Sequence, residues 1–372
     1  MTHRTHRSLQ QRGASLIEIM VGVVIGLIAI LVIYQVFAVS EGLRRNTTGV
    51  GDAQQNGLLT SFALGIELAN AGNGIATSAQ RLYNCSNLSA DPTKSYRPVP
   101  VLITAGATAD LPDEFSVFYS ASTSLVTPVP FASVPTTYAS GADFVVQSPL
   151  PGALNAFKPG DMVIAIKDPR APDVCARSII KTVTGPAGEF VTLAHTLQDG
   201  AGVDFTSESQ LFNLGQATRV QRVRYYTELV DPSKPDSPRI LYSQNLLTPA
   251  IAPVPLASGV VNLKAQYGID TDNDGFLDDW VEASEAGWDA ATLMAGAGTK
   301  IEQLSSIKAV RIGVVTRSEQ FDPAATAFAH TLFNCAAPPC DGAIDITAPA
   351  QWRYRVYETI VPLRNVIWNQ KL

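Results

Sequence analysis

The sequence predicts an α+β protein, in which one long N-terminal helix is followed by a β-rich globular body. An almost unbroken apolar stretch lies near the N-terminus, and a second stretch with helical periodicity follows it. The rest is rich in Val, Thr, Ser and Ala, and the chain contains 24 Pro and 27 Gly, a composition that favours short strands and turns. With 46% hydrophobic and 16% charged residues in a chain of 372, a sizeable core is expected.

The first element is a short basic leader, residues 1–13, with the sequence MTHRTHRSLQQRG. It contains three arginines and no acidic residue. Arginines that flank an apolar segment stay in the cytoplasm by the positive-inside rule. We therefore expect the residues beyond the apolar stretch to lie outside the cytoplasm.

Residues 14–40 form the second element, which is long enough for a transmembrane helix. From Ile19 to Val39 the only strongly polar side chain is Gln35, and about 20 apolar residues cross the hydrocarbon core of a membrane. A cleaved secretory signal is disfavoured, because its apolar region usually has about 7 to 15 residues. A permanent anchor explains the length but not Glu18, since a carboxylate deep in a membrane costs about 2.5–3.5 kcal/mol by insertion scales.

Residues 41–72 are expected to continue the helix as an amphipathic segment. Leu58, Phe62 and Ile66 recur every four residues, a spacing that places them on one helical face. We expect this face to pack on the sheet of the body, as the apolar stripe of a surface helix usually does.

The third element is the body, residues 73–372, which we expect to be β-rich and extracytoplasmic. Apolar, β-branched and aromatic residues cluster between turn residues in six segments, each of which predicts a strand. These segments are residues 115–119, 162–166, 178–183, 220–226, 309–316 and 352–361.

The start of the helix, Gly13-Ala14-Ser15-Leu16-Ile17-Glu18, resembles the type IV prepilin cleavage motif, in which Gly precedes an apolar helix with Glu at its fifth position. The resemblance implies a type IV pilin-like fold, cleavage after Gly13 by prepilin peptidase, and methylation of the new amino terminus at Ala14, where most family members have Phe. It also implies that Glu18 pairs with the N-terminal amine of a neighbouring subunit. Such pairing is physically reasonable, because a buried carboxylate and ammonium are tolerated in apolar surroundings only when they meet.

Four later segments resemble the PilW family of large minor pilins. They are residues 52–57 (DAQQNG), 267–270 (YGID), 310–318 (VRIGVVTRS) and 354–365 (YRVYETIVPLRN). This resemblance implies a low-abundance subunit that helps start pilus assembly near the fibre tip, with other minor pilins, the major pilin and a tip adhesin as candidate partners. It places the protein in the inner membrane, as a single-pass protein with its body in the periplasm, and then in the extracellular pilus, where it would support adhesion or motility.

An acidic loop at residues 270–282 has the pattern of an EF-hand-type calcium site. Side chains at alternating loop positions can converge on one hard cation, and a glycine at position 6 permits the sharp turn. Phe276, at position 7, would offer its backbone carbonyl. Four aspartates stand at positions 1, 3, 5 and 9: Asp270, Asp272, Asp274 and Asp278.

The loop departs from an EF-hand at position 12, where Val281 replaces the bidentate Glu and Asp279 or Glu282 could substitute from beside it. The alternative is a solvated acidic turn that caps a following helix. Six acids between Asp270 and Glu282, with no base among them, would repel one another without a counter-ion. We therefore expect a structural, non-catalytic calcium ion.

Four cysteines, Cys85, Cys175, Cys335 and Cys340, permit three pairings if all are oxidised. The CxxC spacing and neighbouring histidines of a zinc site are lacking, and an exported protein favours disulfides. Cys335 and Cys340 could close a small loop, which would leave Cys85 to pair with Cys175.

Charge and motifs argue against other classes of function. The net charge of −6 and the pI near 5.3 disfavour nucleic-acid binding, which depends on Lys and Arg neutralising phosphates. The sequence lacks GxSxG, GxxxxGK[ST], HExxH and GxGxxG, so we expect no enzyme.

Two alternatives to a minor pilin stay open. A type II secretion pseudopilin would share Gly13 and Glu18, whereas a membrane-anchored, calcium-dependent surface adhesin would need no processing after Gly13.

Overall fold

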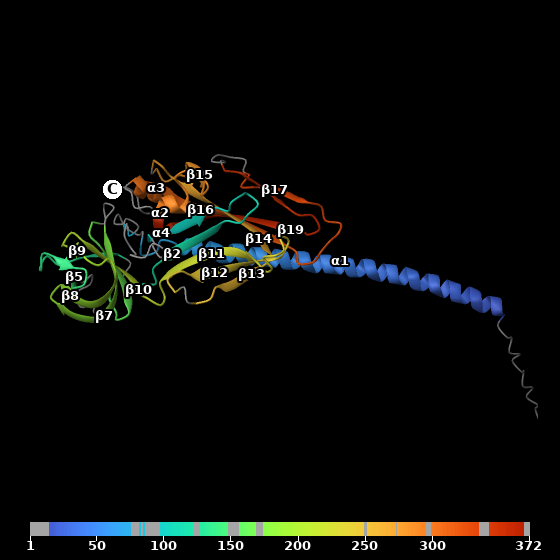
Figure 1. Ribbon diagram of the computed structural model, residues 1–372, viewed down its shortest axis with the longest axis horizontal. Coiled ribbons are helices and arrows are strands. Elements are labelled where there is room, and N and C mark those ends of the chain that lie inside the picture. The colour runs from blue at the N-terminus through green and yellow to red at the C-terminus, as the bar shows by residue number, and fades with distance from the viewer. Residues whose placement is uncertain are drawn as a thin grey trace, which may run out of the picture. The chain divides into compact units, whose positions relative to one another are not determined.

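The computed structural model (Figure 1) describes most of the chain, in two compact units, Met1–Gly51 and Asp52–Leu372. The described residues are 15–75, 82, 85, 97–122, 127–147, 156–168, 174–248, 251–272, 274–294, 299–334 and 342–367. Four residues with predicted roles lie outside them: Gly13, Ala14, Cys335 and Cys340.

Helix α1 spans Leu16–Asn70, so it begins in the first unit and ends in the second. An acid in its first turn, Glu18, is favoured there by the helix dipole. Shortly after its end, Gly72 adopts a φ of 79°, the left-handed conformation that commonly closes a helix. The N–H of Gly72 donates to the carbonyl of Phe118, which ties the helix end to the sheet. The long N-terminal helix predicted from the sequence is confirmed.

Antiparallel sheets make up most of the second unit. In the five-stranded sheet the order is β1 (Val101–Thr104), β2 (Glu114–Tyr119), β11 (Gln221–Leu229), β12 (Arg239–Asn245) and β13 (Val254–Ser258). In the six-stranded sheet it is β3 (Val129–Pro130), β10 (Gln210–Gln216), β6 (Asp161–Ile166), β7 (Cys175–Ala187), β8 (Phe190–Asp199) and β5 (Phe144–Gln147). In the four-stranded sheet it is β15 (Asp279–Glu282), β14 (Val260–Ile269), β16 (Ile307–Arg317) and β19 (Tyr354–Pro362).

Two smaller pairs and three short helices complete the described elements. The pairs are β17 (Phe328–Leu332) with β18 (Ile344–Ala348), and β4 (Tyr138–Ala139) with β9 (Asp204–Phe205). The helices are α2 (Ala290–Met294), α3 (Thr299–Ser306) and α4 (Arg364–Ile367). The six predicted strand segments fall in β2, β6, β7, β11, β16 and β19, which confirms the β-rich body.

Two main hydrophobic cores stabilise the second unit. The larger core joins Leu64 and Leu68 of α1 to Phe115 of β2 and Tyr267 of β14, and it extends through the five- and four-stranded sheets. The other core belongs to the six-stranded sheet, and the aromatic rings of Phe131, Phe144 and Phe205 pack together within it. Figure 1 shows β5, β7 and β8 at the opposite end of this unit from β17.

The predicted packing face of α1 is wrong. Leu58, Phe62 and Ile66 are 54%, 68% and 45% exposed, instead of packing on the sheet. The buried face carries other residues at helical spacing: Ala53, Gly57, Thr60, Leu64 and Leu68. The face with small residues is the one that packs, because β16 and β19 approach the helix so closely that larger side chains would collide with them.

Candidate functional site

From Ile19 to Val39, α1 is apolar on nearly all sides, and Gln35 is its only strongly polar residue. Large side chains along it are mostly exposed, from Leu16 at 76% through Ile25 at 62% to Phe37 at 71%. The helix is long and apolar enough to cross a membrane, and none of its most apolar stretch is buried. Glu18 is its only charged residue up to Ser40. This surface suits hydrocarbon or other apolar helices far better than water.

Hydrogen bonds from three strands hold residues 53–56 of α1. The hydroxyl of Thr316 donates to the carbonyl of Ala53 at 2.9 Å, and that of Tyr357 donates to the carbonyl of Gln54 at 3.1 Å. The Nδ2 amide of Asn56 donates to the carbonyl of Ser258 at 3.2 Å. These bonds come from β16, β19 and β13, so widely separated parts of the sequence converge on one helix.

Farther along α1, Glu67 is tied to the five-stranded sheet. The hydroxyl of Tyr119 donates to Glu67 Oε2 at 3.0 Å. Burial, together with the neighbouring Glu67 carboxylate, raises the pKa of the Tyr119 and Tyr225 phenols well above the ordinary value. Both phenols therefore stay neutral donors beside this carboxylate across the physiological range.

The acidic loop is a hairpin connection between β14 and β15. The last residue pair of the two strands before the loop is Ile269 with Asp279. Beside this pair, the N–H of Asp278 donates to the carbonyl of Ile269 at 2.8 Å. On the other side, the N–H of Asp270 donates to the carbonyl of Ser306 at 2.9 Å, just before β16 begins. The two ends of the loop are thus held by backbone bonds to three adjacent segments of the four-stranded sheet.

Three of the four predicted metal-binding aspartates converge in this loop. One carboxylate oxygen from each of Asp270, Asp272 and Asp278 lies within 4.8 Å of the others. The fourth, Asp274, lies outside this group, and its Oδ1 accepts the N–H of Phe276 at 2.8 Å. Asn273 lies outside the described residues.

Asp278 and Asp270 both accept hydrogen bonds from within the loop. Asp278 Oδ2 accepts the hydroxyl and the N–H of Thr271 at 2.5 and 2.6 Å, and these bonds lower the pKa of Asp278. Asp270 is only 2% exposed, and its Oδ2 accepts the N–H of Gly275 at 3.2 Å. Its other oxygen, Oδ1, is buried without a hydrogen-bond partner among the described residues.

The two residues considered as substitutes for the position-12 ligand have other partners. Val281 itself is 5% exposed and lies within β15. Asp279 Oδ1 accepts the N–H of Trp280, and Glu282 accepts bonds from Gln266 and from the hydroxyl of Ser284. In this arrangement neither acid joins the group around Asp270.

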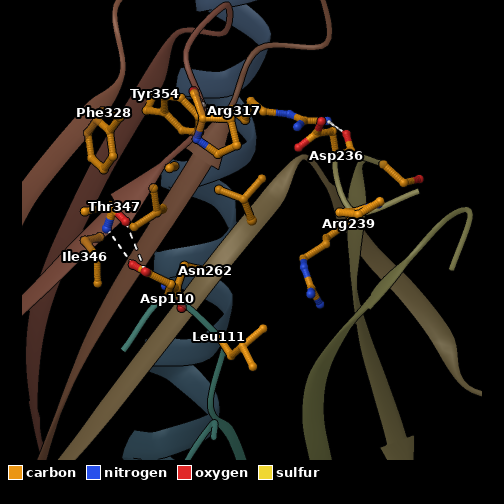
Figure 2. Close-up of a pocket in the computed structure, with 16 residues that line it drawn as sticks. Asp110, Leu111, Asp236, Arg239, Asn262, Arg317, Phe328, Ile346, Thr347 and Tyr354 are labelled. Atoms are coloured by element: carbon orange, nitrogen blue, oxygen red, sulfur yellow. Dashed lines mark hydrogen bonds between the residues drawn. The ribbon is translucent and has the colours of Figure 1, made fainter. Parts of the chain in front are cut away.

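A cavity of about 400 Å³ separates the β17–β18 hairpin from the turn before β12 (Figure 2). On one wall, the carboxylate of Asp110 accepts the N–H and the hydroxyl of Thr347 at 2.6 and 3.0 Å. On the other, Arg317 Nη2 donates to the carbonyl of Asp236 at 3.0 Å. Burial lowers the pKa of Arg239, which also lines the cavity. These bonds hold the hairpin and the turn in place around the four-stranded sheet.

Cys85 and Cys175 form a disulfide that joins the segment after α1 to the start of β7, across 90 residues of sequence. Both cysteines are almost completely buried. This is one of the pairings that the sequence left open. A bridge across this length of sequence restricts the unfolded chain and so contributes to the stability of the second unit.

Comparison with known proteins gives one match. No curated protein and no solved structure matches the chain. The profile of the PilW family, described as type IV pilus-assembly protein W, matches residues 232–365. That region runs from the turn before β12 to α4, and it includes the acidic loop and the strands β16 and β19 that hold α1. Residues 232–365 of this 372-residue chain are therefore similar to the PilW family of type IV pilus-assembly proteins.

Proposed function

We propose that this chain is a minor pilin that helps to start pilus assembly near the fibre tip. In this proposal prepilin peptidase removes residues 1–13, and Ala14 becomes the methylated amino terminus. Residues 14–40 hold the protein in the inner membrane as a single-pass subunit with its body in the periplasm. The subunit then enters the extracellular pilus together with other minor pilins and the major pilin.

The observation that carries this proposal is Glu18, the one charged residue in the apolar segment 14–40 of the helix. A carboxylate that enters apolar surroundings requires an opposite charge, and the ammonium at Ala14 of a neighbouring subunit would supply one. Cleavage after Gly13 would create that ammonium. One acid at this position therefore links processing of the leader to assembly of the filament.

A second support comes from the exposed stripe on α1. Leu58, Phe62 and Ile66 are apolar, large and at least 45% exposed, and they lie on one side of the helix. Contiguous exposed apolar residues commonly mark a contact surface. Packed helices of neighbouring subunits would remove this stripe from water, as the filament proposal requires.

The size of the body supports a location at the tip. Residues 73–372 form a large mass for a subunit that is repeated along a fibre, whereas a subunit at the end has no neighbour beyond it. A low-abundance subunit at that end would affect how many pili begin, and it could present a tip adhesin. Through the number of pili it would support adhesion or motility.

Processing is tested by the intact mass of membrane-extracted protein in a host with active prepilin peptidase. We expect the wild-type protein to lack residues 1–13 and to carry one methyl group, and we expect Gly13→Val to keep the leader. A wild-type protein that retains Met1 to Gly13 would refute the pilin proposal and favour a surface adhesin on a simple anchor.

Assembly is tested in a deletion strain complemented with variants. We expect deletion to reduce surface pili several-fold while the amount of major pilin in the membrane stays unchanged. Glu18→Gln should fail to restore pili, whereas Glu41→Gln, on the same helix beyond the apolar segment, should restore them. Normal piliation with a defect in protein secretion would instead identify a type II secretion pseudopilin.

A further inference from the structure

We propose that the loop from Asp270 to Asp278 binds one Ca²⁺ ion, which ties together the β14–β15 connection and the start of β16. The ion would be structural. It would be held by carboxylate oxygens from Asp270, Asp272 and Asp278 and by the backbone carbonyl of Phe276.

The buried carboxylate of Asp270 is the first step of the argument. The side chain is 98% buried, and its Oδ1 has no hydrogen-bond partner among the described residues. Burying a carboxylate oxygen without a partner is costly, because the oxygen loses its bonds to water and gains nothing in return. A bound cation would remove this cost.

The spacing of the carboxylates is the second step. The oxygens of Asp270, Asp272 and Asp278 that face one another lie within 4.8 Å. Calcium binds oxygen at 2.3–2.6 Å, so oxygens on opposite sides of one ion are about 5 Å apart. The three carboxylates therefore already stand at a separation that one calcium ion spans.

The donor set favours calcium over other metals. All the ligands are oxygens, which suit hard cations, and no histidine or cysteine lies within the loop. Magnesium requires a near-ideal octahedron at 2.0–2.1 Å and loses its water reluctantly, so it is usually bound by one or two carboxylates, whereas three converge here. With Val281 in place of the bidentate Glu, water would complete the coordination. We expect a Kd of about 10⁻⁴–10⁻³ M, the range of extracellular calcium modules.

The positions of the loop ends explain what the ion would do. Asp270 follows β14, Asp278 precedes β15, and the N–H of Asp270 bonds to Ser306 beside β16. An ion between the two aspartates would therefore connect three segments of the sheet. Lys308, on β16, is the competing source of positive charge, because it lines a small cavity together with Asp270 and Gly275.

The test uses the full-length protein in detergent micelles, with melting temperature and calorimetric binding measured in calcium, in magnesium and in chelator. Terbium luminescence excited through Trp280, which follows the loop directly, reports whether a cation binds there. The variants are Asp270→Asn and Asp272→Asn. The matched control is Asp204→Asn, which removes an exposed aspartate from β9 in another sheet.

We expect calcium at 10–30 times its Kd to raise the melting temperature of the wild-type protein by about 2–5 °C. Magnesium at the same concentration should have a clearly smaller effect. Both loop variants should lose at least ten-fold in calcium affinity and in terbium luminescence, while the Asp204 variant should behave as wild type. Because Asp272 is exposed, its variant is expected to fold even if the Asp270 variant does not.

Two results would overturn the proposal. The first is an equal melting temperature in calcium and in chelator, with no binding at millimolar calcium, which would make Lys308 the group that compensates Asp270. The second is calcium binding that is unchanged in Asp272→Asn and in Asp270→Asn, which would place the ion elsewhere.

Discussion

The ring of Tyr357 on β19 lies directly over Gly57 of α1, so that a Cβ atom at residue 57 would overlap it. That atom would be 2.9 Å from Cζ of the ring and closer still to Cδ2 and Cε2. From the same position the Tyr357 hydroxyl donates to the carbonyl of Gln54. Gly57 is therefore needed for its lack of a side chain, which lets a strand more than 290 residues later in the sequence touch the helix backbone.

Gly57→Ala is expected to destabilise the protein by about 1–3 kcal/mol, because overpacking the contact with Tyr357 outweighs the better helix propensity of Ala. The measurement is the free energy of unfolding or, where unfolding is irreversible, the melting temperature. Gly51→Ala is the matched control on the same helix, where nothing lies within 4 Å of an added Cβ. It should be neutral or stabilising by up to about 1 kcal/mol. Equal effects of the two substitutions would contradict this packing.

Lys264 and Asp113 form a buried ion pair at 2.8 Å, with both side chains about 5% exposed. Asp113 also accepts the N–H of Ala265 and the N–H of Gly106, so its carboxylate is held in place. Lys264→Met should cost about 3–5 kcal/mol, because it leaves this buried carboxylate without its counter-charge.

Chemical denaturation of the Lys264 variant measures this cost as a shift of the transition midpoint. The control is Lys234→Met, which breaks the exposed pair with Asp231 and should change stability by no more than about 1 kcal/mol. If Lys264→Met is as well tolerated as this surface change, the buried pair is not a stabilising feature.

We expect His195 on β8 to make the body less stable in mild acid. Its Nε2 bonds to the carbonyl of Ala142 at 2.7 Å, its ring packs 4.0 Å from that of Phe144, and its buried Nδ1 has no partner among the described residues. Burial lowers the pKa of His195, and Lys181 lowers it further, against opposing effects of the Ala142 carbonyl and Asp143.

Because the folded pKa of His195 lies below the ordinary value near 6.5, the unfolded chain binds the proton more readily between the two values. Stability is therefore unaffected by this residue above pH 6.5 and decreases as the pH falls below it. His195→Gln should lose less melting temperature than the wild-type protein between pH 7.5 and pH 5.5. An identical loss in both proteins would show that another group is responsible.

The overall fold could be predicted because its signals are local. An apolar run that is too long for a strand specifies the start of α1, and β-branched and aromatic residues between turns specify β2, β6, β16 and β19. Such patterns reflect the periods of the helix and the strand themselves, so they need no knowledge of what packs against them.

Strand β14 was not predicted, and the burial of its polar side chains could not be predicted from its residues. Asn262, Lys264 and Gln266 alternate with apolar residues, a pattern typical of a strand with one face in water. In the structure all three polar side chains are buried, because loops and neighbouring strands cover that face and supply partners such as Asp113. A partner about 150 residues away in the sequence leaves no local signal.

The hydrophobic pattern of the sequence also could not predict which face of α1 packs against the body. The sequence contains two apolar faces on that helix, and the larger side chains, Leu58, Phe62 and Ile66, make the stronger hydrophobic signal. Which face meets the body depends on how closely β16 and β19 approach, and they approach the side where Gly57 leaves room.

The sequence by itself determined the long N-terminal helix, with Glu18 as the one acid of its apolar segment, the β-rich body, and the spacing of aspartates in the acidic loop. Each of these features depends on residues that are close together in the sequence. Only the tertiary structure decided that Asp270 is buried with one oxygen that has no hydrogen-bond partner among the described residues, that Asp274 lies outside the group of converging carboxylates, and that Cys85 meets Cys175. Burial and pairing depend on segments that are distant in sequence and are brought together only when the sheets form.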